Sequence, residues 1–154
     1  MKIGLISDTH DYLDGRVADI FQGVEHILHA GDIGMPWLIN ELEQLAPTTA
    51  VLGNTDSLIS FRDTEVVVLG EKKFFLTHIV NPQALTPSQM ERIQIEKPDV
   101  VMFGHTHKPY WKKTGNLFFL NPGYAGKSRF GMERSVAVMD IIGREMSVKF
   151  VPLA

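Results

Sequence analysis

The stretch Ile3-Gly4-Leu5-Ile6-Ser7-Asp8-Thr9-His10 sets a pattern that the rest of the chain repeats. Its apolar first half predicts a buried strand, and a carboxylate and an imidazole follow that strand two positions apart, at Asp8 and His10. In an extended backbone, residues i and i+2 project to the same side, so we expect these two side chains to converge on one point. The pair alone is a weak signal, because Asp and His at this spacing often cap a helix or lie in a turn.

Four further apolar runs also end at residues that bind hard or borderline metal ions. The runs are residues 25–30, 49–52, 72–76 and 99–103, and the metal-binding residues after them are Asp32, Asn54, His78, His105 and His107. Sheets of α/β proteins bind ligands at the carboxyl ends of their strands, so these side chains are predicted to meet in one site. One ion does not need seven ligands, whereas two ions sharing a bridging carboxylate would use them all, as in hydrolytic phosphoesterases.

Hydrophobic periodicity, together with glycine and proline, predicts the other elements of the chain. Three helices are expected, at residues 17–21 before Gly23, from Pro36 to before Pro47, and from Pro87 to before Pro98. Residues 57–64 are expected to form an irregular loop, and a turn at Gly70 joins strands 65–69 and 72–76 into a hairpin. Four alternating runs in the last third predict an antiparallel sheet, at residues 110–113, 117–120, 136–142 and 146–151.

The composition is that of an ordinary globular protein. The 154 residues are 44% hydrophobic and 21% charged, and no linker or repeat divides them, so we expect one domain over residues 1–154. The formal net charge of −3 argues against a nucleic-acid-binding surface, which usually carries a basic stripe. The chain has no cysteine, so a metal site must use oxygen and imidazole ligands. No apolar stretch has the length of a signal peptide or a membrane span, and we expect a cytoplasmic protein.

The order and spacing of the candidate ligands resemble the motifs of the calcineurin-like metallophosphoesterase superfamily. In this chain the motifs are Asp8-x-His10, Gly31-Asp32, Gly53-Asn54-x-Asp56, His78 and Gly104-His105-x-His107. The small size, the run His29-Ala30-Gly31-Asp32 and the later Asn121-Pro122-Gly123 are similar to the compact single-domain phosphodiesterases of that superfamily, which are related to the retromer subunit of similar fold. The resemblance implies an α/β fold, a four-layer α/β/β/α sandwich.

The resemblance also implies a role for each candidate ligand. One divalent ion would be held by Asp8, His10 and His107, and a second by Asn54, His78 and His105. Asp32 and a hydroxide would bridge the ions, and the catalytic residues would be Asp32, Asn54 and His105. Mn²⁺ is the expected metal, and Fe, Zn²⁺ and Ni²⁺ are also compatible with these ligands. With its two carboxylates and hydroxide counted, the site keeps a small positive charge, so a phosphate can bind there and be attacked in line.

Three departures from the family pattern bear on the substrate. Thr55 follows Asn54, where phosphatase members carry a His that protonates the leaving group. A threonine hydroxyl is a poor general acid, so the chain should favour diesters. His78-Ile79-Val80 stands where compact relatives often have His-Gly-His, and residues 124–129 differ from the Ser and Pro-Arg that relatives tend to have there. The specificity of relatives therefore does not carry over to this chain.

Four other polar residues near the motifs have simpler interpretations. His26 and His29 lie within a predicted strand and are expected in the core or at the surface rather than at a metal ion. Asp11 and Asp56 are expected to form turns or to accept hydrogen bonds from ligating imidazoles. None of the four is counted as a ligand.

Two features later in the chain have alternative interpretations. Lys127 and Arg129 could neutralise a second phosphate of the substrate, but a solvated cationic turn is favoured. Trp111 could stack on a nucleotide base, whereas aromatic residues in amphipathic runs more often fill the core.

The sequence therefore predicts a metal-dependent phosphodiesterase that hydrolyses a small organic phosphodiester. A phosphomonoesterase using the same centre is the alternative among enzymes, and Thr55 argues against it. A protein-binding scaffold, as in the retromer relative, predicts lost ligands, whereas all seven ligand types are present. The expected partner is a small phosphoester substrate, with no membrane or strong nucleic-acid signal, and a homo-oligomer is left open.

Overall fold

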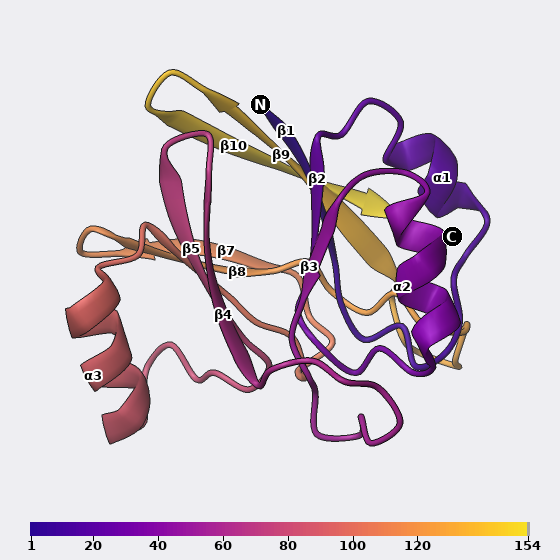
Figure 1. Cartoon of the computed structure of the whole chain (residues 1–154), viewed down its shortest axis with the longest axis horizontal. Coiled ribbons are helices and arrows are strands. Elements are labelled where there is room, and N and C mark those ends of the chain that lie inside the picture. The colour runs from indigo at the N-terminus through magenta and orange to yellow at the C-terminus, as the bar shows by residue number, and fades with distance from the viewer. Residues whose placement is uncertain (154) are drawn as a thin grey trace.

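Two five-stranded sheets form the centre of the computed structural model, which describes residues 1–153 (Figure 1). The first sheet has the order β10-β9-β1-β2-β3, with strands β1 (Lys2–Ile6), β2 (His26–His29), β3 (Thr48–Ala50), β9 (Ser135–Ile142) and β10 (Glu145–Pro152). The second has the order β4-β5-β6-β8-β7, with strands β4 (Thr64–Leu69), β5 (Lys72–Thr77), β6 (Val100–Met102), β7 (Tyr110–Thr114) and β8 (Leu117–Asn121). Strands β1, β2 and β3 are parallel, and so are β5, β6 and β8.

Buried hydrophobic side chains hold four layers together. Alternate strand residues point to opposite faces, so Leu5 of β1 enters the cluster between the sheets while Ile6 enters the cluster on the helix side. The latter cluster packs the first sheet against α1 (Arg16–Ile20) and α2 (Pro36–Glu43). A third cluster around Phe75 packs the second sheet against α3 (Pro87–Glu96) through Ile93. Helices thus cover the two outer faces (Figure 1), which confirms the predicted α/β/β/α sandwich.

The helix boundaries follow from local sequence. Helix α3 begins with a capping box, in which the Thr86 hydroxyl accepts from the Gln89 amide and the Gln89 side chain accepts from the Thr86 amide. The helix ends at Lys97, in the left-handed conformation, directly before Pro98. Helix α2 starts with Pro36 in its first turn, as predicted, because proline lacks the N–H that a first turn leaves unpaired.

The predicted strands and helices are all present, with ends shifted by a few residues, but the pairing of the later strands differs. Only β7 with β8 and β9 with β10 form the expected antiparallel pairs. Strand β8 is parallel to β6, and β9 joins the other sheet beside β1, so the prediction of one antiparallel sheet is wrong. Alternating hydrophobicity identifies a strand with two different faces, but it does not identify the neighbour to which the strand bonds.

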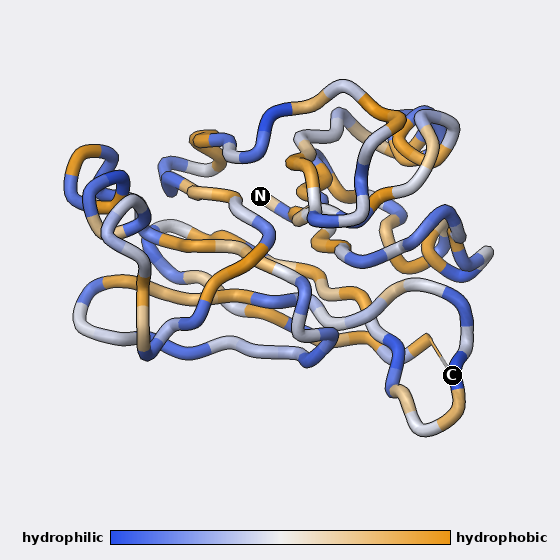
Figure 2. The backbone as a smooth tube through the Cα atoms, turned by 90° about the horizontal axis from the view of Figure 1, so that it is seen from below, coloured by the Kyte–Doolittle hydropathy of each residue, from blue (hydrophilic) through white to orange (hydrophobic). Residues whose placement is uncertain are grey.

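Hydrophobic segments run through both sheets, and hydrophilic segments are concentrated in the connecting loops (Figure 2). None of the helices in residues 1–153 combines the length and the apolar character needed to cross a bilayer.

Candidate metal centre

The loop after β1 has a left-handed backbone conformation where it enters the site. Strand β1 ends at Ile6, and Asp8 and His10 have φ angles of 56° and 46°. The expectation of an extended backbone here is therefore wrong, although the two side chains do converge. The turn is stabilised by pairing with the loop after β2, because the His10 amide donates to the Asp32 carbonyl at 3.0 Å and the Asp11 amide to the Ile33 carbonyl at 2.8 Å.

Five of the seven predicted ligands share this unusual conformation. Positive φ angles are found at Asp8, His10, Asp32, His105 and His107. Left-handed backbone at residues other than glycine costs free energy, and such conformations concentrate at functional sites, where the surrounding structure holds them. Five of the eight non-glycine residues with positive φ are therefore candidate ligands, and the other three are Asp11, Glu71 and Lys97.

The structure brings the predicted ligands together as two adjacent groups. The first group is Asp8, His10 and His107, and the second is Asp32, His78 and His105. Within each group, one potential ligand atom per residue lies within 4.8 Å of the others. The amide oxygen of Asn54 lies 3.1 Å from Nδ1 of His105, which places Asn54 at the second group. All seven predicted residues are thus at one site, and their individual ligand roles stay predictions.

The carboxylate of Asp8 is oriented by two donors. Its Oδ2 accepts from the Ser7 hydroxyl at 2.7 Å and from the His105 amide at 3.1 Å. Its Oδ1 is buried and has no hydrogen-bond partner in the described residues. Gly104 makes this approach possible, because a Cβ at that position would overlap the Ser7 hydroxyl. One oxygen of Asp8 is therefore fixed by the protein, and the other is directed into the site.

The imidazoles are oriented in the same way. His78 is buried, and its Nδ1–H donates to the Ala30 carbonyl at 2.7 Å, which directs Nε2 into the site. The Nε2 atoms of His78 and His10 are buried without a hydrogen-bond partner among residues 1–153. Burial alone would lower the pKa of His78, but the Asp32 carboxylate, the Ala30 carbonyl and the Asp8 carboxylate raise it.

Asp32 lies between the two groups. Its Oδ1 accepts from the Thr55 amide at 2.9 Å. Its Oδ2 lies 3.2 Å from Nε2 of His78 in one group and 3.6 Å from Nε2 of His10 in the other. Burial alone would raise the pKa of Asp32, but the neighbouring His78 imidazole and the Thr55 donors lower it below its ordinary value. Asp32 is therefore ionised and placed where a bridging carboxylate would be.

These residues fit divalent metal ions. Three buried potential ligand atoms have no hydrogen-bond partner in the described residues: Oδ1 of Asp8 and Nε2 of His10 and His78. Burying each of these polar atoms costs free energy unless a bound cation replaces the missing hydrogen bond. Two ligand atoms bound to one ion lie about 3.0–3.4 Å apart at tetrahedral or octahedral angles. The 3.3 Å between His107 Nε2 and Asp8 Oδ1 and the 3.2 Å between His78 Nε2 and Asp32 Oδ2 match that spacing. Imidazole and carboxylate together suit Mn²⁺, Fe, Zn²⁺ or Ni²⁺.

His29 supports the site without being part of either group. It is fully buried, and burial followed by the charge of His78 lowers its pKa to about 3. Its Nδ1 accepts from the Gly31 amide at 3.1 Å, so the proton is on Nε2, which donates to the Thr9 hydroxyl at 3.0 Å. Thr9 in turn donates to the Ile33 carbonyl at 2.8 Å. A neutral His29 thus links the two loops that carry the first two ligand motifs.

The Asp56 and Asp11 carboxylates accept hydrogen bonds from backbone amides near the motifs. Asp56 accepts from the amides of Ile33 and Gly53, each at 2.9 Å. Asp11 accepts from the Met35 amide at 3.0 Å and from the Trp37 indole at 2.6 Å. These bonds agree with the expected turn-forming role of both carboxylates.

His26 and Trp111 lie away from the metal-binding groups. His26 is half-buried and bonded to the Thr49 hydroxyl at 2.8 Å. Trp111 stacks on Phe118 at 4.5 Å and packs against the cluster between the sheets, which agrees with a core role rather than with stacking on a base.

Two residues at the end of β8 and in the loop after it contact the site and are missing from the predicted set. Asn121 is buried and donates to the Gly104 carbonyl and to the Thr106 hydroxyl, each at 3.1 Å, which fixes the loop that carries His105 and His107. The Tyr124 ring lies 4.8 Å from the His107 ring and 6.2 Å from the His10 ring. The motif Asn121-Pro122-Gly123 is visible in the sequence, but nothing in it indicates that Tyr124 forms a wall of the site.

The same loop brings a positive charge to the site. The Arg129 guanidinium lies over the Tyr124 ring, 5.4 Å from its centroid. Burial lowers the pKa of His107, the Asp8 carboxylate opposes this, and the nearby His10 and Arg129 side chains lower it further. Arg129 is therefore close enough to influence the centre electrostatically.

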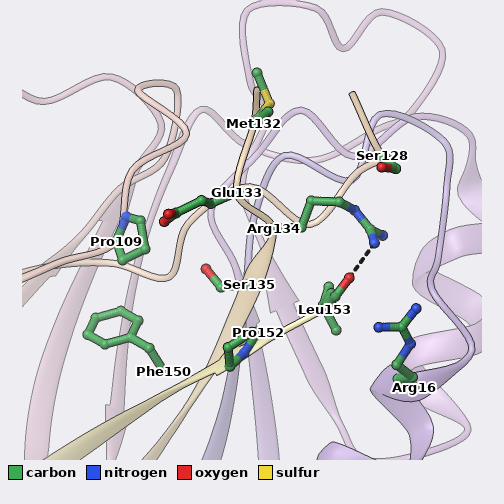
Figure 3. Close-up of a pocket in the computed structure, with 10 residues that line it drawn as sticks. All are labelled: Arg16, Pro109, Ser128, Met132, Glu133, Arg134, Ser135, Phe150, Pro152 and Leu153. Atoms are coloured by element: carbon green, nitrogen blue, oxygen red, sulfur yellow. Dashed lines mark hydrogen bonds between the residues drawn. The ribbon is translucent and has the colours of Figure 1, made fainter. Parts of the chain in front are cut away.

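Two cavities lie near these loops. A small one of about 270 Å³ opens beside the centre and is lined by His10, Asp11, Gly34, Met35, Thr55, Asp56, Ser57 and Leu58. A larger one of about 710 Å³ contains none of the seven candidate ligands and lies behind the loop after β8 (Figure 3). It is lined by Arg16, Pro109, Ser128, Met132, Glu133, Arg134, Ser135, Phe150, Pro152 and Leu153. Only the smaller of the two cavities borders a candidate ligand, so it is the one at which the motifs indicate phosphoester chemistry.

Sequence relatives of this chain are phosphoesterases. A probable metallophosphoesterase of Methanothermobacter thermautotrophicus is 33% identical over 160 residues, which cover 98% of this chain and 92% of that protein. A phosphodiesterase of Methanocaldococcus jannaschii is 32% identical over 142 residues, which cover 80% of this chain and 83% of the relative.

Solved structures share the fold. An archaeal phosphodiesterase has a TM-score of 0.78 at 28% identity, over 98% of this chain and all of that chain. Vps29 of Entamoeba histolytica, solved with Zn²⁺, has a TM-score of 0.77 at 22% identity, over 99% of both chains, and at this identity it shows the fold alone.

A family model settles the relationship. Residues 1–144 match the calcineurin-like phosphoesterase superfamily domain, which covers the whole set of candidate ligands. The resemblance inferred from the motifs is confirmed, and with it a family of metal-dependent hydrolases of phosphate esters. The chain belongs to the calcineurin-like phosphoesterase superfamily.

Proposed function

We propose that this protein is a phosphodiesterase that hydrolyses a small organic phosphodiester at a centre of two divalent metal ions. The observation that carries the proposal is the pair of adjacent groups, each combining a carboxylate with two imidazoles, which meet at Asp8 and Asp32. The phosphodiesterase activity named for a relative in Methanocaldococcus jannaschii supports the choice of substrate class.

In this proposal Asp8, His10 and His107 hold one ion, Asn54, His78 and His105 hold the other, and Asp32 is shared. Mn²⁺ is the proposed metal. Bound divalent ions supply Lewis acidity toward the phosphoryl oxygens and lower the pKa of a coordinated water. The protein's part is to fix its donor atoms in advance, which Ser7 does for Asp8 and the Ala30 carbonyl does for His78.

The exposure of the ligands indicates the side from which the substrate approaches. Asp8, Asp32 and His78 are buried, whereas Asn54 and His105 are exposed. A phosphoryl group therefore reaches the centre past Asn54 and His105, which agrees with a catalytic role for these two residues. Because the His78 imidazole and the Thr55 amide lower the pKa of Asp32, this carboxyl group stays ionised and does not serve as the proton donor.

Thr55 supports a diester substrate. Its amide is bonded to Asp32, so the residue is at the centre, but its hydroxyl has no acidity near neutral pH. Leaving groups that need little protonation, such as an aryl oxide, should therefore leave fastest. A phosphomonoesterase using the same centre would need a proton donor at this position.

A protein-binding scaffold is the second candidate, because the fold is shared with Vps29. A scaffold does not require ionised and oriented ligands, whereas here the unpaired buried Nε2 atoms of His10 and His78 lie 3.9 and 3.8 Å from the unpaired buried Oδ1 of Asp8. We therefore prefer the enzyme, with a small phosphoester as its partner.

The test is hydrolysis of bis-p-nitrophenyl phosphate and p-nitrophenyl phosphate by metal-stripped protein resupplied with Mn²⁺. We expect faster turnover of the diester, dependence on added metal, and loss of activity in the Asp32→Asn variant. The exposed Asp63→Asn variant is the matched control and should retain activity. Faster monoester turnover would favour the phosphatase, and two bound ions per chain without turnover of either substrate would favour the scaffold.

A further inference from the structure

Arg129 is an exposed cation with no anionic partner in the described residues. It lies in the loop between β8 and β9, and its guanidinium contacts the Tyr124 ring, 5.4 Å from the ring centroid. No carboxylate of residues 1–153 comes within 4.0 Å of it, although most other arginines of the chain have one. Its five N–H donors are therefore available to a ligand.

The position of Arg129 relative to the centre is set by Tyr124. The Tyr124 ring is buried and lies 4.8 Å from the His107 ring, so Arg129 and the imidazole contact the same aromatic side chain. Lys127, two residues earlier in the same exposed turn, makes no such ring contact. Lys127 and Arg129 are both exposed, as expected for a solvated cationic turn, but only Arg129 is held against a side chain of the site.

The base of the loop is fixed, so the arginine is not carried by a loose segment. The Tyr124 hydroxyl donates to the Lys127 carbonyl at 2.8 Å. Arg134 closes the other end by donating to the Gly126 and Leu153 carbonyls, each at 2.6 Å, and the bond to Leu153 is drawn in Figure 3. Residues 127–131 project from this base into solvent, except that Arg129 is held over Tyr124.

The charge of a phosphodiester indicates which group of the substrate Arg129 contacts. A phosphodiester carries one negative charge, and two divalent ions with the carboxylates of Asp8 and Asp32 already supply enough positive charge to hold it. The guanidinium also lies against Tyr124 rather than among the ligand atoms, so it is placed for a group beside the scissile phosphate. Arginine binds carboxylate and phosphate groups by paired, charge-assisted hydrogen bonds.

Resting on the proposed function, we propose that Arg129 binds a second negatively charged group of the substrate, a carboxylate or a phosphate attached next to the scissile phosphodiester. The substrate class is then an organic phosphodiester with a further anionic substituent, rather than a neutral one. Arg129 would act as a specificity residue that contacts the substrate beside the metal-binding groups.

The test uses two ligands of the same skeleton, propylphosphonate and 3-phosphonopropionate, titrated calorimetrically into Mn²⁺-loaded protein. We expect the ligand with the carboxylate to bind about tenfold more tightly, the value of one exposed charge-assisted contact. The Arg129→Gln variant should bind both ligands equally, and Lys127→Gln, the matched control, should keep the preference. The metal content of all three proteins should be the same, since neither residue belongs to the metal-binding groups.

Propane-1,3-diphosphonate then distinguishes a phosphate from a carboxylate as the preferred second anion. Equal binding of the first two ligands by the unmodified protein would overturn the inference, as would a preference that survives in Arg129→Gln or disappears in Lys127→Gln. These results would leave the proposed function standing if propylphosphonate still bound and the aryl diester were still hydrolysed. Binding of neither phosphonate, with no diester turnover, would overturn both.

Discussion

At the scale of single residues, the two oxygens of Asp8 have different tasks. Oδ2 is held by the Ser7 hydroxyl and the His105 amide, and Oδ1 is left for a cation. Replacing Ser7 by Ala removes the shorter of these bonds, so Asp8 is less well oriented. We expect the Ser7→Ala variant to bind Mn²⁺ about tenfold more weakly, as is usual when a residue that orients a ligand is lost.

Calorimetric titration of metal-stripped protein measures this affinity. The exposed Ser60→Ala variant is the control and should bind as the unmodified protein does. Unchanged affinity in Ser7→Ala would mean that the His105 amide alone orients Asp8.

The proposal of a diester substrate rests on Thr55, whose hydroxyl cannot protonate a leaving group. The proposal can be tested by placing a general acid at this position. In the Thr55→His variant an imidazole is placed beside Asp32, while the amide bond to Asp32 is retained. We expect kcat/KM for an alkyl monoester such as β-glycerophosphate to rise by about tenfold or more relative to that for bis-p-nitrophenyl phosphate, because an alkoxide leaving group needs a proton and a positioned general acid contributes about 10²–10⁴.

Paired steady-state assays at pH 6–8 measure this ratio. Ser60→His places the same imidazole further along the loop, at an exposed residue that does not line the opening beside the centre, and should leave the ratio unchanged. If both variants raised it equally, added charge rather than proton donation would be the cause.

The residue scale also shows what the sequence predicts well and what it misses. The seven ligand types and their order are readable, because each follows an apolar run. The backbone conformation between the ligands cannot be read from the sequence. The spacing of Asp8 and His10 suggested an extended chain, whereas both residues have a left-handed backbone conformation. Tyr124 was missed for a related reason: its contact with His107 is made only in the folded chain, across residues distant in sequence.

At the scale of elements, strand positions were predictable and strand partners were not. Every predicted strand is present because its apolar alternation is a local property. The pairing of β8 with β6 depends on how the connection between them crosses the sheet, which is a property of the whole fold. The ligand residues were still found, because they follow strands whatever the partners of those strands are.

The clearest link between elements is the ion pair of Asp14 and Arg134, which joins the start of α1 to the β9 end of the loop after β8. Asp14 accepts from the Arg16 amide and from Arg134, both at 2.9 Å, and both side chains of the ion pair are buried. Burial alone would raise the pKa of Asp14, but these donors and the two guanidinium charges lower it. The stabilisation by Asp14 is therefore present above about pH 4 and is lost as the pH falls through the lowered pKa.

We expect the Asp14→Asn variant to be destabilised by about 3 kcal/mol at pH 7, because Arg134 is left buried without its carboxylate. The difference from the unmodified protein should narrow toward pH 3, where Asp14 is increasingly protonated. Urea unfolding at both pH values measures the two free energies, with the exposed Asp19→Asn as the control. A difference that stays constant with pH would show that the ionised form of Asp14 is not the source of the stability.

At the scale of the whole molecule, the metal-binding groups connect the two sheets. Asp8, His10 and Asp32 follow strands of the first sheet, and His78, His105 and His107 follow strands of the second. Each group contains residues from both sheets. An ion bound to either group therefore links two layers that are otherwise joined by the apolar cluster between them and by a few loop hydrogen bonds.

This arrangement predicts that divalent ions stabilise the entire fold rather than a loop. A ligand that binds only the native state raises the free energy of unfolding by about 2.7 kcal/mol at a hundred times its Kd. We expect Mn²⁺ to raise the urea midpoint of metal-stripped protein, with far-UV and near-UV signals shifting together, and a chelator to reverse the change. His107→Gln and His105→Gln, each altering one group, should retain part of the effect, and the double variant should lose most of it. A midpoint that did not respond to Mn²⁺, or that responded equally in the double variant, would mean that the ions do not join the sheets through these residues.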